Sequence, residues 1–310
     1  MEKLNITTSN NNEKADYKSG VVALIARPNV GKSTLLNKIL NQKIAIATPL
    51  KQTTRKNLKG IYTDNEAQIV IIDTPGIHKP QNELGKYLSM QSKEAICDVD
   101  LILFIVDAQQ QAGAGDSWIV QNYLQDTKTP VLLVLNKADL IKDITKRDLN
   151  LYTYKKLFNR NIQTCVISAK TGRNIDDLIK RIKTYLPSGE KFYDEDTVTD
   201  VNLREIVSEI IREKIILNTK DEVPHSVAVL IDKYEEKENI DKISAKIIVN
   251  NDSQKGILIG KNGAMLKKIG QSAREEFEKI VEKKVYLELF VKVHKNWLKD
   301  KNTIKEFGYE

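Results

Sequence analysis

The sequence is short of cysteine and has no long apolar run, and both shortages limit its class. Cys97 and Cys165 are the only cysteines in 310 residues, and their spacing fits neither a metal site nor a disulfide framework. No apolar stretch approaches the about 20 residues of a membrane-spanning helix. The N-terminus also lacks the apolar core of a secretory signal. We therefore expect a cytoplasmic protein with two free thiols, whose membrane contact would be peripheral.

Acidic residues are missing from one stretch of an otherwise mixed chain. The formal net charge is +7, which alone is weak support for a polyanionic partner. Residues 253–274 carry no acidic residue, and their basic residues are Lys255, Lys261, Lys267, Lys268 and Arg274. Such a local excess is typical of a nucleic-acid contact.

The first part of the chain alternates short apolar runs with helical patterns, and the length suggests two domains. Residues 1–17 are polar and aperiodic, which predicts a disordered tail. Residues 18–187 predict an α/β domain in which a mostly parallel sheet is flanked by helices, with ligands beyond the C-terminal strand ends. The predicted strands are Val21–Ala26, Gln68–Asp73, Leu101–Asp107, Val131–Asn136 and Gln163–Ser168.

A change of pattern after Pro187 marks a second domain. Residues 188–200 are charged and aperiodic, as expected of a linker. Residues 201–310 predict an α+β domain of order α-β-β-α-α-β. The expected elements are a helix over Asn202–Leu217, strands over Ser226–Lys233 and Lys242–Val249, a helical pair within Lys255–Lys283, and a strand over Val285–Val293.

A phosphate-binding loop follows the first predicted strand and precedes a helical pattern, as such loops require. Its residues are Pro28, Asn29, Val30, Gly31, Lys32, Ser33 and Thr34. Gly31 permits a turn whose N–H groups face phosphate, Lys32 reaches the β- and γ-phosphates, and Ser33 is a Mg²⁺ ligand. Ala26 stands where such loops usually begin with glycine. A Gly-Lys-Ser triplet alone also arises by chance, so the downstream motifs matter.

Two further segments fit phosphate sensing. Asp73, Thr74, Pro75 and Gly76 end a predicted strand, and there a carboxylate holds the magnesium shell while a glycine N–H senses the γ-phosphate. In Gln52-Thr53-Thr54-Arg55 we expect Thr54, in preference to Thr53, to bind Mg²⁺ when the γ-phosphate is present. Considered alone, Asp73–Gly76 is better explained as an ordinary proline-glycine turn, and Gln52–Arg55 fits an ordinary turn about as well as a Mg²⁺ site.

A tetrapeptide at the end of the strand Val131–Asn136 indicates the base. Asp139 can accept hydrogen bonds from guanine N1–H and the exocyclic amine, Asn136 supports the loop, and the Lys137 stem packs on the ring. Adenine offers neither donor there, and a site built on such bonds rejects analogues by about 10⁴–10⁵. Ser168, Ala169 and Lys170 follow another strand, where backbone N–H groups would approach guanine O6. The sequence therefore predicts a guanine nucleotide.

The second domain contains a Gly-x-x-Gly loop between two helical patterns, as in KH modules. Gly260 and Gly263 permit close approach of a nucleic-acid backbone, and Lys261 favours its phosphates. The predicted RNA-binding residues are Lys255, Ile257, Ile259, Gly260, Lys261, Asn262, Gly263, Lys267 and Lys268. The alternatives are a tight helix–helix turn and, for the two isoleucines, core packing. The order of elements matches the type II KH arrangement.

The wording of these motifs resembles the Era family of GTPases. It comprises Pro28–Asn37, Gln52–Arg55 and Asp73–Gly76, with Pro224-His225-Ser226 and Trp297 in the second domain. The resemblance implies hydrolysis of GTP to GDP, with Mg²⁺ held by Ser33, Thr54 and, through water, Asp73. It also implies binding to the 3′ end of small-subunit ribosomal RNA, a role in 30S assembly, and contact with the inner membrane face. We expect a monomer.

The catalytic residues implied are Lys32, Thr54, Gly76 and Asn29, the last through a K⁺ ion held beside the phosphates. Ile77 stands where Ras-like enzymes have a water-orienting glutamine, so we expect slow intrinsic hydrolysis. Three alternatives remain: another ribosome- or tRNA-associated GTPase, an RNA chaperone with little hydrolysis, and a metabolic P-loop kinase.

Overall fold

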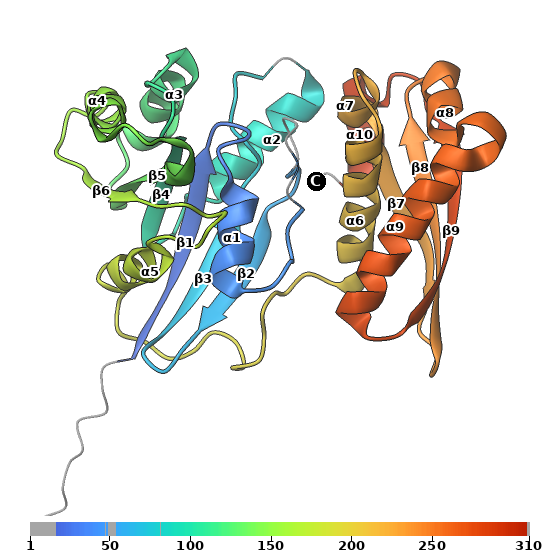
Figure 1. The fold of residues 1–310 in the computed structure, drawn as a ribbon, viewed down its shortest axis with the longest axis horizontal. Helices are drawn as coiled ribbons and strands as arrows, with labels where there is room; N and C mark the ends of the chain where they lie inside the picture. Colours follow the sequence, from blue (N-terminus) through green and yellow to red (C-terminus); the bar gives the residue numbers. More distant parts are fainter. Residues whose placement is uncertain (1–16, 47, 49–53, 81, 309–310) are drawn as a thin grey trace, which may run out of the picture.

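Two α/β units lie side by side in the computed structural model, joined by one extended segment (Figure 1). The structure describes residues 17–46, 48, 54–80 and 82–308, so most of the predicted tail lies outside it. None of the helices in these ranges combines the length and hydropathy that crossing a bilayer requires.

Within the described residues, six strands form the first sheet, in the order β2-β3-β1-β4-β5-β6. The β2–β3 pair is antiparallel and the other pairs are parallel, so the ends of β1, β3, β4 and β5 meet at one edge. The strands are β1 (Lys18–Ala26), β2 (Leu58–Thr63), β3 (Ala67–Asp73), β4 (Leu101–Asp107), β5 (Val131–Asn136) and β6 (Gln163–Val166).

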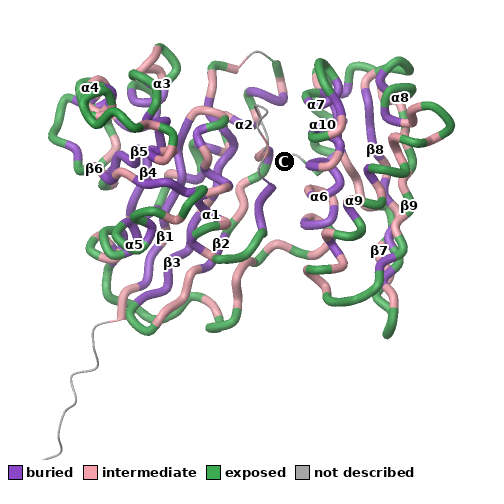
Figure 2. The backbone as a smooth tube through the Cα atoms, in the orientation of Figure 1, coloured by how far each residue is buried: buried purple, intermediate pink, exposed green. Residues whose placement is uncertain are grey.

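Helices cover both faces of this sheet because apolar residues in its strands point alternately to either side. Val22 and Leu24 pack with α1 and α5, whereas Ala23 and Ile25 pack with α3 and α4. Figure 2 shows the central strands as buried. The helices are α1 (Lys32–Leu40), α2 (Glu83–Glu94), α3 (Ala114–Ile119), which continues as a π-helical turn (Val120–Leu124), α4 (Ile144–Lys155) and α5 (Ile175–Lys183).

The sequence pattern missed β2 and placed the end of β6 two residues too late. β2 lies at the sheet edge, and its residues include Lys59 and Gly60, which interrupt an apolar pattern. The strand is held by its pairing with β3, from Leu58 opposite Asp73 to Thr63 opposite Gln68.

Residues 188–200 contain neither a helix nor a named strand, yet they adhere to the first unit. Buried Gln68 donates to Tyr193 O at 2.9 Å and accepts from Phe192 N and Tyr193 N at 2.7 and 2.9 Å. Ile61 N donates to Val198 O at 2.8 Å. The connection is therefore fixed along the edge of the sheet.

The second unit packs helices on one face of a sheet of order β7-β8-β9, counted within the described residues. Val207, Ile211, Ile269 and Phe277 on α6 and α9 form its core with the strands. Its elements are α6 (Leu203–Asn218), α7 (Val223–Ser226), β7 (Ala228–Glu235), β8 (Ile240–Val249), α8 (Asp252–Ile259), a 3₁₀ turn (Lys261–Gly263), α9 (Ala264–Val281), β9 (Lys284–Val293), a second 3₁₀ turn (Trp297–Lys299) and α10 (Lys301–Glu306).

A separate apolar cluster joins the two units. Leu84 and Leu88 on α2 pack with Trp297, Ile304 and Phe307 from the C-terminal segment. The indole of Trp297 is fully buried and donates to Ser226 O at 2.9 Å. The C-terminal segment thus lies between the second sheet and α2, which fixes one unit against the other.

This cluster predicts unequal effects for two substitutions on α2. Leu88 is 2% exposed and Met90 is 49% exposed. Leu88→Ala should lower the free energy of unfolding by about 2–5 kcal/mol, because it leaves a cavity between the units. Met90→Ala should change it by no more than about 0.5 kcal/mol. Urea denaturation measures both, and equal losses would contradict a packed interface.

Candidate guanine-nucleotide and RNA sites

The phosphate loop passes through left-handed backbone before α1 begins. Asn29 has φ 67° and Gly31 has φ 97°, and Gly31 caps the N-terminus of α1. A Cβ on Gly31 would lie 2.5 Å from Asn136 Nδ2, so both the backbone angle and the neighbour require glycine. The helix directs its free N–H groups and its dipole toward the loop, which suits an anion there.

Ala26, the departure from the usual loop, causes no distortion. Its side chain is fully buried in the core under α1, and its carbonyl accepts from Ile77 N at 2.9 Å. The methyl group belongs to the same apolar core as Val30 of the loop. The missing glycine therefore leaves the phosphate loop intact.

Three oxygen-bearing side chains converge beside the loop, as the magnesium prediction requires. Ser33 Oγ donates to Asp73 Oδ2 at 2.6 Å, and Thr54 Oγ1 lies 3.0 Å from Ser33 Oγ and 3.3 Å from Asp73 Oδ2. Among the described residues, the buried Asp73 Oδ1 has no hydrogen-bond partner. Two hydroxyls and a carboxylate oxygen without a partner form a hard donor set that fits Mg²⁺. Thr53, the rejected alternative, lies outside the described residues.

Lys32 and Asp73 are both buried, and each offsets the other's charge. Burial lowers the pKa of Lys32, while the Asp73 carboxylate acts in the opposite direction. Burial raises the pKa of Asp73, and Lys32, Ser33 and Thr54 oppose that shift. A buried lysine in this position is a preorganised cation for phosphate oxygens.

The base-reading loops are tied together by Asn136. Its Nδ2 donates to Val30 O at 2.8 Å in the phosphate loop, and its Oδ1 accepts from Ala169 N at 2.9 Å. Ser168 Oγ donates to Asp139 Oδ1 at 2.5 Å. The carboxylate of Asp139 is thereby oriented where a guanine edge would meet it.

The Lys137 side chain spans the loop as well. Its backbone is left-handed, and its Nζ donates to Asn29 O at 2.7 Å and to Asp107 Oδ2 at 2.9 Å. Asp107 was not singled out from the sequence. Its position at the C-terminal end of β4, among other strand ends that carry motifs, was the available signal.

A cavity of about 660 Å³ connects these parts. Among the described residues, five of the predicted site residues do not line it: Val30, Asp73, Thr74, Pro75 and Ser168. The predicted residues that do line it are Pro28, Asn29, Gly31, Lys32, Ser33, Thr34, Thr54, Gly76, Asn136, Lys137, Asp139, Ala169 and Lys170. The structure thus gathers the separate motifs around one nucleotide-sized space.

The residue after the switch glycine faces away from this space. Ile77 is buried in the core between the sheet and α3, so its side chain has a packing role. Gly76 lies close to Pro28, whose Cα would be 3.0 Å from a Cβ at that position. Water in the site must therefore be oriented by other groups.

In the second unit, the Gly-x-x-Gly loop has the backbone that its glycines allow. Gly260 and Gly263 have φ 70° and 78°, Asn262 has φ 53°, and Lys261 and Asn262 are exposed. A groove of about 480 Å³ beside the loop is lined by Gly263, Leu266, Lys267, Gly270, Gln271, Arg274, Tyr286, Leu287 and Leu289. It lies between α9 and β9.

Among the described residues, Gly263 and Lys267 are the predicted RNA residues that line this groove, and the others lie outside its lining. Ile257 is exposed on α8 and Ile259 is half-buried at its end, and neither lines the groove among the described residues. Lys268 is exposed on α9, and Lys255 is half-buried on α8. The apolar lining comes instead from leucines on α9 and β9, which were not singled out from the sequence.

Comparison with known proteins agrees with both sites. A family model described as a 50S ribosome-binding GTPase matches residues 21–137, and a KH-domain model matches residues 222–298. The GTPase Era of Rippkaea orientalis is 47% identical over 295 residues, covering 95% of this chain and 93% of that protein. The GTPase Era of Staphylococcus haemolyticus is 44% identical, covering 95% and 98%.

The chain belongs to the Era family of GTPases. Solved Era structures share its fold over both units. One is an Aquifex aeolicus Era variant bound to GDP·AlF₄⁻, with 40% identity, a TM-score of 0.91, and coverage of 94% of this chain and 99% of that one. Another is Era in complex with MgGDPNP and nucleotides 1506–1542 of 16S ribosomal RNA, with 39% identity, a TM-score of 0.90 and the same coverage. The kinase alternative is thereby excluded.

The carboxylate of Asp139, oriented by Ser168, can be tested as the group that recognises the base. Asp139→Asn should change the preference from GTP to XTP, because xanthine presents a carbonyl where guanine has its amino group and the new amide can donate to it. Competition between the two nucleotides for the purified variant measures the change. The matched control is Asp143→Asn, which retains an N-cap for α4 outside the cavity. Unchanged GTP preference in Asp139→Asn would contradict the assignment.

Proposed function

We propose that this Era-family protein is a GTP-hydrolysing switch that binds small-subunit ribosomal RNA near its 3′ end during assembly of the 30S subunit. The observation that carries the proposal is the likeness to the Era complex with MgGDPNP and nucleotides 1506–1542 of 16S ribosomal RNA, which extends over 94% of this chain. The nucleotide cavity and the groove beside the Gly-x-x-Gly loop lie on the two units that this likeness spans.

In the nucleotide site, each side chain has a role that its position supports. Lys32 contacts the β/γ-phosphate region, and Asp139 accepts from the guanine edge. Ser33 and Thr54 would hold Mg²⁺, with Asp73 reaching it through water, and the ion would neutralise phosphate charge. The N–H of Gly76 senses the γ-phosphate. Because Ile77 is a core residue, hydrolysis without a partner is slow.

A monovalent cation belongs to the proposal as well. Asn29 is exposed at the rim of the cavity on left-handed backbone, so its amide is accessible to an ion beside the phosphates. A K⁺ ion there would offset the charge that develops during hydrolysis. GTP turnover should therefore be faster in potassium than in sodium at matched ionic strength, and equal rates would remove the ion from the proposal.

The RNA contact is assigned to the groove between α9 and β9 and to its loop. Lys261, Lys267 and Lys268 are exposed and would meet phosphates, while the leucines of the groove would pack against unstacked bases. Gly260, Asn262 and Gly263 would allow the RNA strand to approach the protein backbone of the loop. Lys255, Ile257 and Ile259 on α8 would border the bound strand.

The organisation proposed for the chain follows these sites. The GTPase domain comprises residues 18–187, the connection 188–200, and the type II KH domain 201–310, with a tail over 1–17. The protein would act as a monomer in the cytoplasm, with peripheral association to the inner face of the membrane.

Crosslinking to total RNA tests the function directly. With GTP bound, the attached sequences should be enriched in the 3′ end of small-subunit ribosomal RNA, and GDP should reduce that enrichment, because the nucleotide biases the two-domain state. Enrichment of unrelated RNAs, indifferent to nucleotide, would contradict the switch.

Two lysines on α9 provide a matched pair for the same assay. Lys267→Ala should weaken RNA binding and reduce the log–log salt slope by about 0.7, the value for one lost single-strand phosphate contact. Lys279 is exposed in the last turn of the helix, away from the groove, so Lys279→Ala should leave both quantities unchanged. Binding titrations across salt concentrations decide between them.

A further inference from the structure

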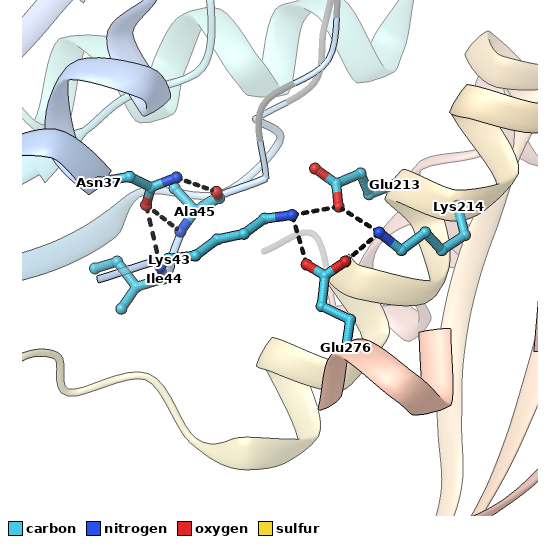
Figure 3. A network of polar contacts seen from close by, with 7 residues as sticks. All are labelled: Asn37, Lys43, Ile44, Ala45, Glu213, Lys214 and Glu276. Atoms are coloured by element: carbon cyan, nitrogen blue, oxygen red, sulfur yellow. Dashed lines mark hydrogen bonds and ion pairs between the residues drawn. The ribbon is translucent and has the colours of Figure 1, made fainter. Parts of the chain in front are cut away.

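A charge cluster around the buried carboxylate of Glu213 attaches the GTPase domain to the KH domain. Lys43, in the loop after α1, donates to Glu213 Oε2 on α6 at 2.7 Å and to Glu276 Oε1 on α9 at 2.5 Å (Figure 3). Lys214 pairs with the same two carboxylates. Glu213 is only 3% exposed, so these two lysines take the place of water around its carboxylate.

Two groups of this cluster, Lys43 and Glu276, have pKa values shifted toward their ionised forms. Burial opposes ionisation of Glu276, yet hydrogen bonds from Lys214 and Lys43 keep its pKa below the usual value. Burial likewise acts to lower the pKa of Lys43, but the hydrogen bonds that it donates to Glu213 and Glu276 raise it. Removing Lys43 would leave two acidic groups facing one lysine.

A second attachment lies on the other side of Thr54. Arg55 is 2% exposed, and its guanidinium donates to Val227 O at 2.7 Å and His225 O at 3.1 Å. Both carbonyls belong to the KH domain, at the junction of α7 and β7. The buried guanidinium of Arg55 is therefore bound to the KH domain, although Arg55 directly follows Thr54 of the magnesium site in the sequence.

Inside the GTPase domain, the same loop is tied to the phosphate-binding helix. Asn37 on α1 accepts from Ile44 N and Ala45 N at 3.0 and 2.9 Å, and donates to Ala45 O at 2.7 Å (Figure 3). Lys43 therefore sits on a loop whose following residues are fixed relative to α1, and Arg55 directly follows Thr54.

We propose that Lys43 and Arg55 are positioning residues, through which the KH domain holds Thr54 in place for Mg²⁺ and the γ-phosphate. The proposal rests on the role of Thr54 in the proposed function. Fixing Arg55, next to Thr54, and Lys43, on the loop that leaves α1, lowers the entropy cost of ordering Thr54 when the triphosphate binds. GDP has no γ-phosphate to engage Thr54, so the benefit is specific to the triphosphate.

This arrangement also links the two ligands. Glu276 lies on α9 two residues beyond Arg274, which lines the RNA groove. RNA bound along α9 thus contacts the same helix that holds Lys43. By reciprocity, any effect of RNA on triphosphate affinity equals the effect of triphosphate on RNA affinity.

Affinities of the full-length protein for GDPNP and GDP with Mg²⁺, without RNA, test the proposal. Lys43→Met should weaken GDPNP binding about fivefold or more, at the lower end of coupling between sites, and leave GDP binding unchanged. Lys43→Arg should retain the wild-type ratio of GDPNP affinity to GDP affinity, since it keeps a cation between the two carboxylates. Lys43 is 42% exposed, so its substitution is compatible with folding.

The matched control is Lys56→Met. Lys56 also forms an ion pair across the domain interface, with Glu205 on α6 at 3.2 Å, but both side chains are 43% exposed. An exposed pair contributes little, so neither affinity should change. Arg55→Ala is the second test, and it should reproduce the selective loss of GDPNP affinity.

Equal losses for GDP and GDPNP in Lys43→Met would reduce Lys43 to a structural role and overturn the proposal, as would no loss at all. A loss in Lys56→Met equal to that in Lys43→Met would also overturn it, because any interface charge would then suffice. If wild-type protein did not bind the RNA 3′ end, the proposed function would fail while this RNA-free measurement still stood.

Discussion

The nucleotide site depends on the hydrogen bonds that the side chain of Asn136 makes to two neighbouring loops. A single buried amide satisfies a carbonyl of the phosphate loop and an N–H of the loop after β6, while its own backbone begins the guanine-reading loop. Its Nδ2 also occupies the space that a side chain on residue 31 would need. The position of Asn136 thus requires glycine at position 31, and the two loops that would bind phosphate and base are held together as one rigid unit.

The sequence could predict this site because its parts lie at the ends of parallel strands. Apolar runs identify β1, β3, β4 and β5, and the sheet brings their C-terminal ends to one edge. The polar residue types at those ends then specify the chemistry. The structure also brings Thr54 Oγ1 to 3.0 Å from Ser33 Oγ, although no strand precedes Thr54, which only the wording of its motif singled out.

The interface between the domains could not be predicted in the same way. Arg55 reaches carbonyls 170 and 172 residues away along the chain, and backbone carbonyls leave no trace in side-chain composition. Glu213 and Glu276 lie on helices whose apolar residues already account for the buried face. From the sequence, their charged side chains are therefore expected to face solvent. The edge strand β2 was not predicted for a related reason, because its pairing with β3, and not its own sequence pattern, makes it a strand.

The parts of the GTPase domain that touch the KH domain follow the two phosphate-sensing motifs in the sequence. Arg55 comes directly after Thr54, and α2, which packs on Trp297, begins seven residues after Gly76. Each motif is therefore joined to the interface by a short stretch of chain and a packed contact, with no long chain of intermediates between them. The connection over residues 188–200 is hydrogen-bonded to the GTPase domain, so the contacts that join the KH domain to that domain come from α6, α7, α9 and the C-terminal segment.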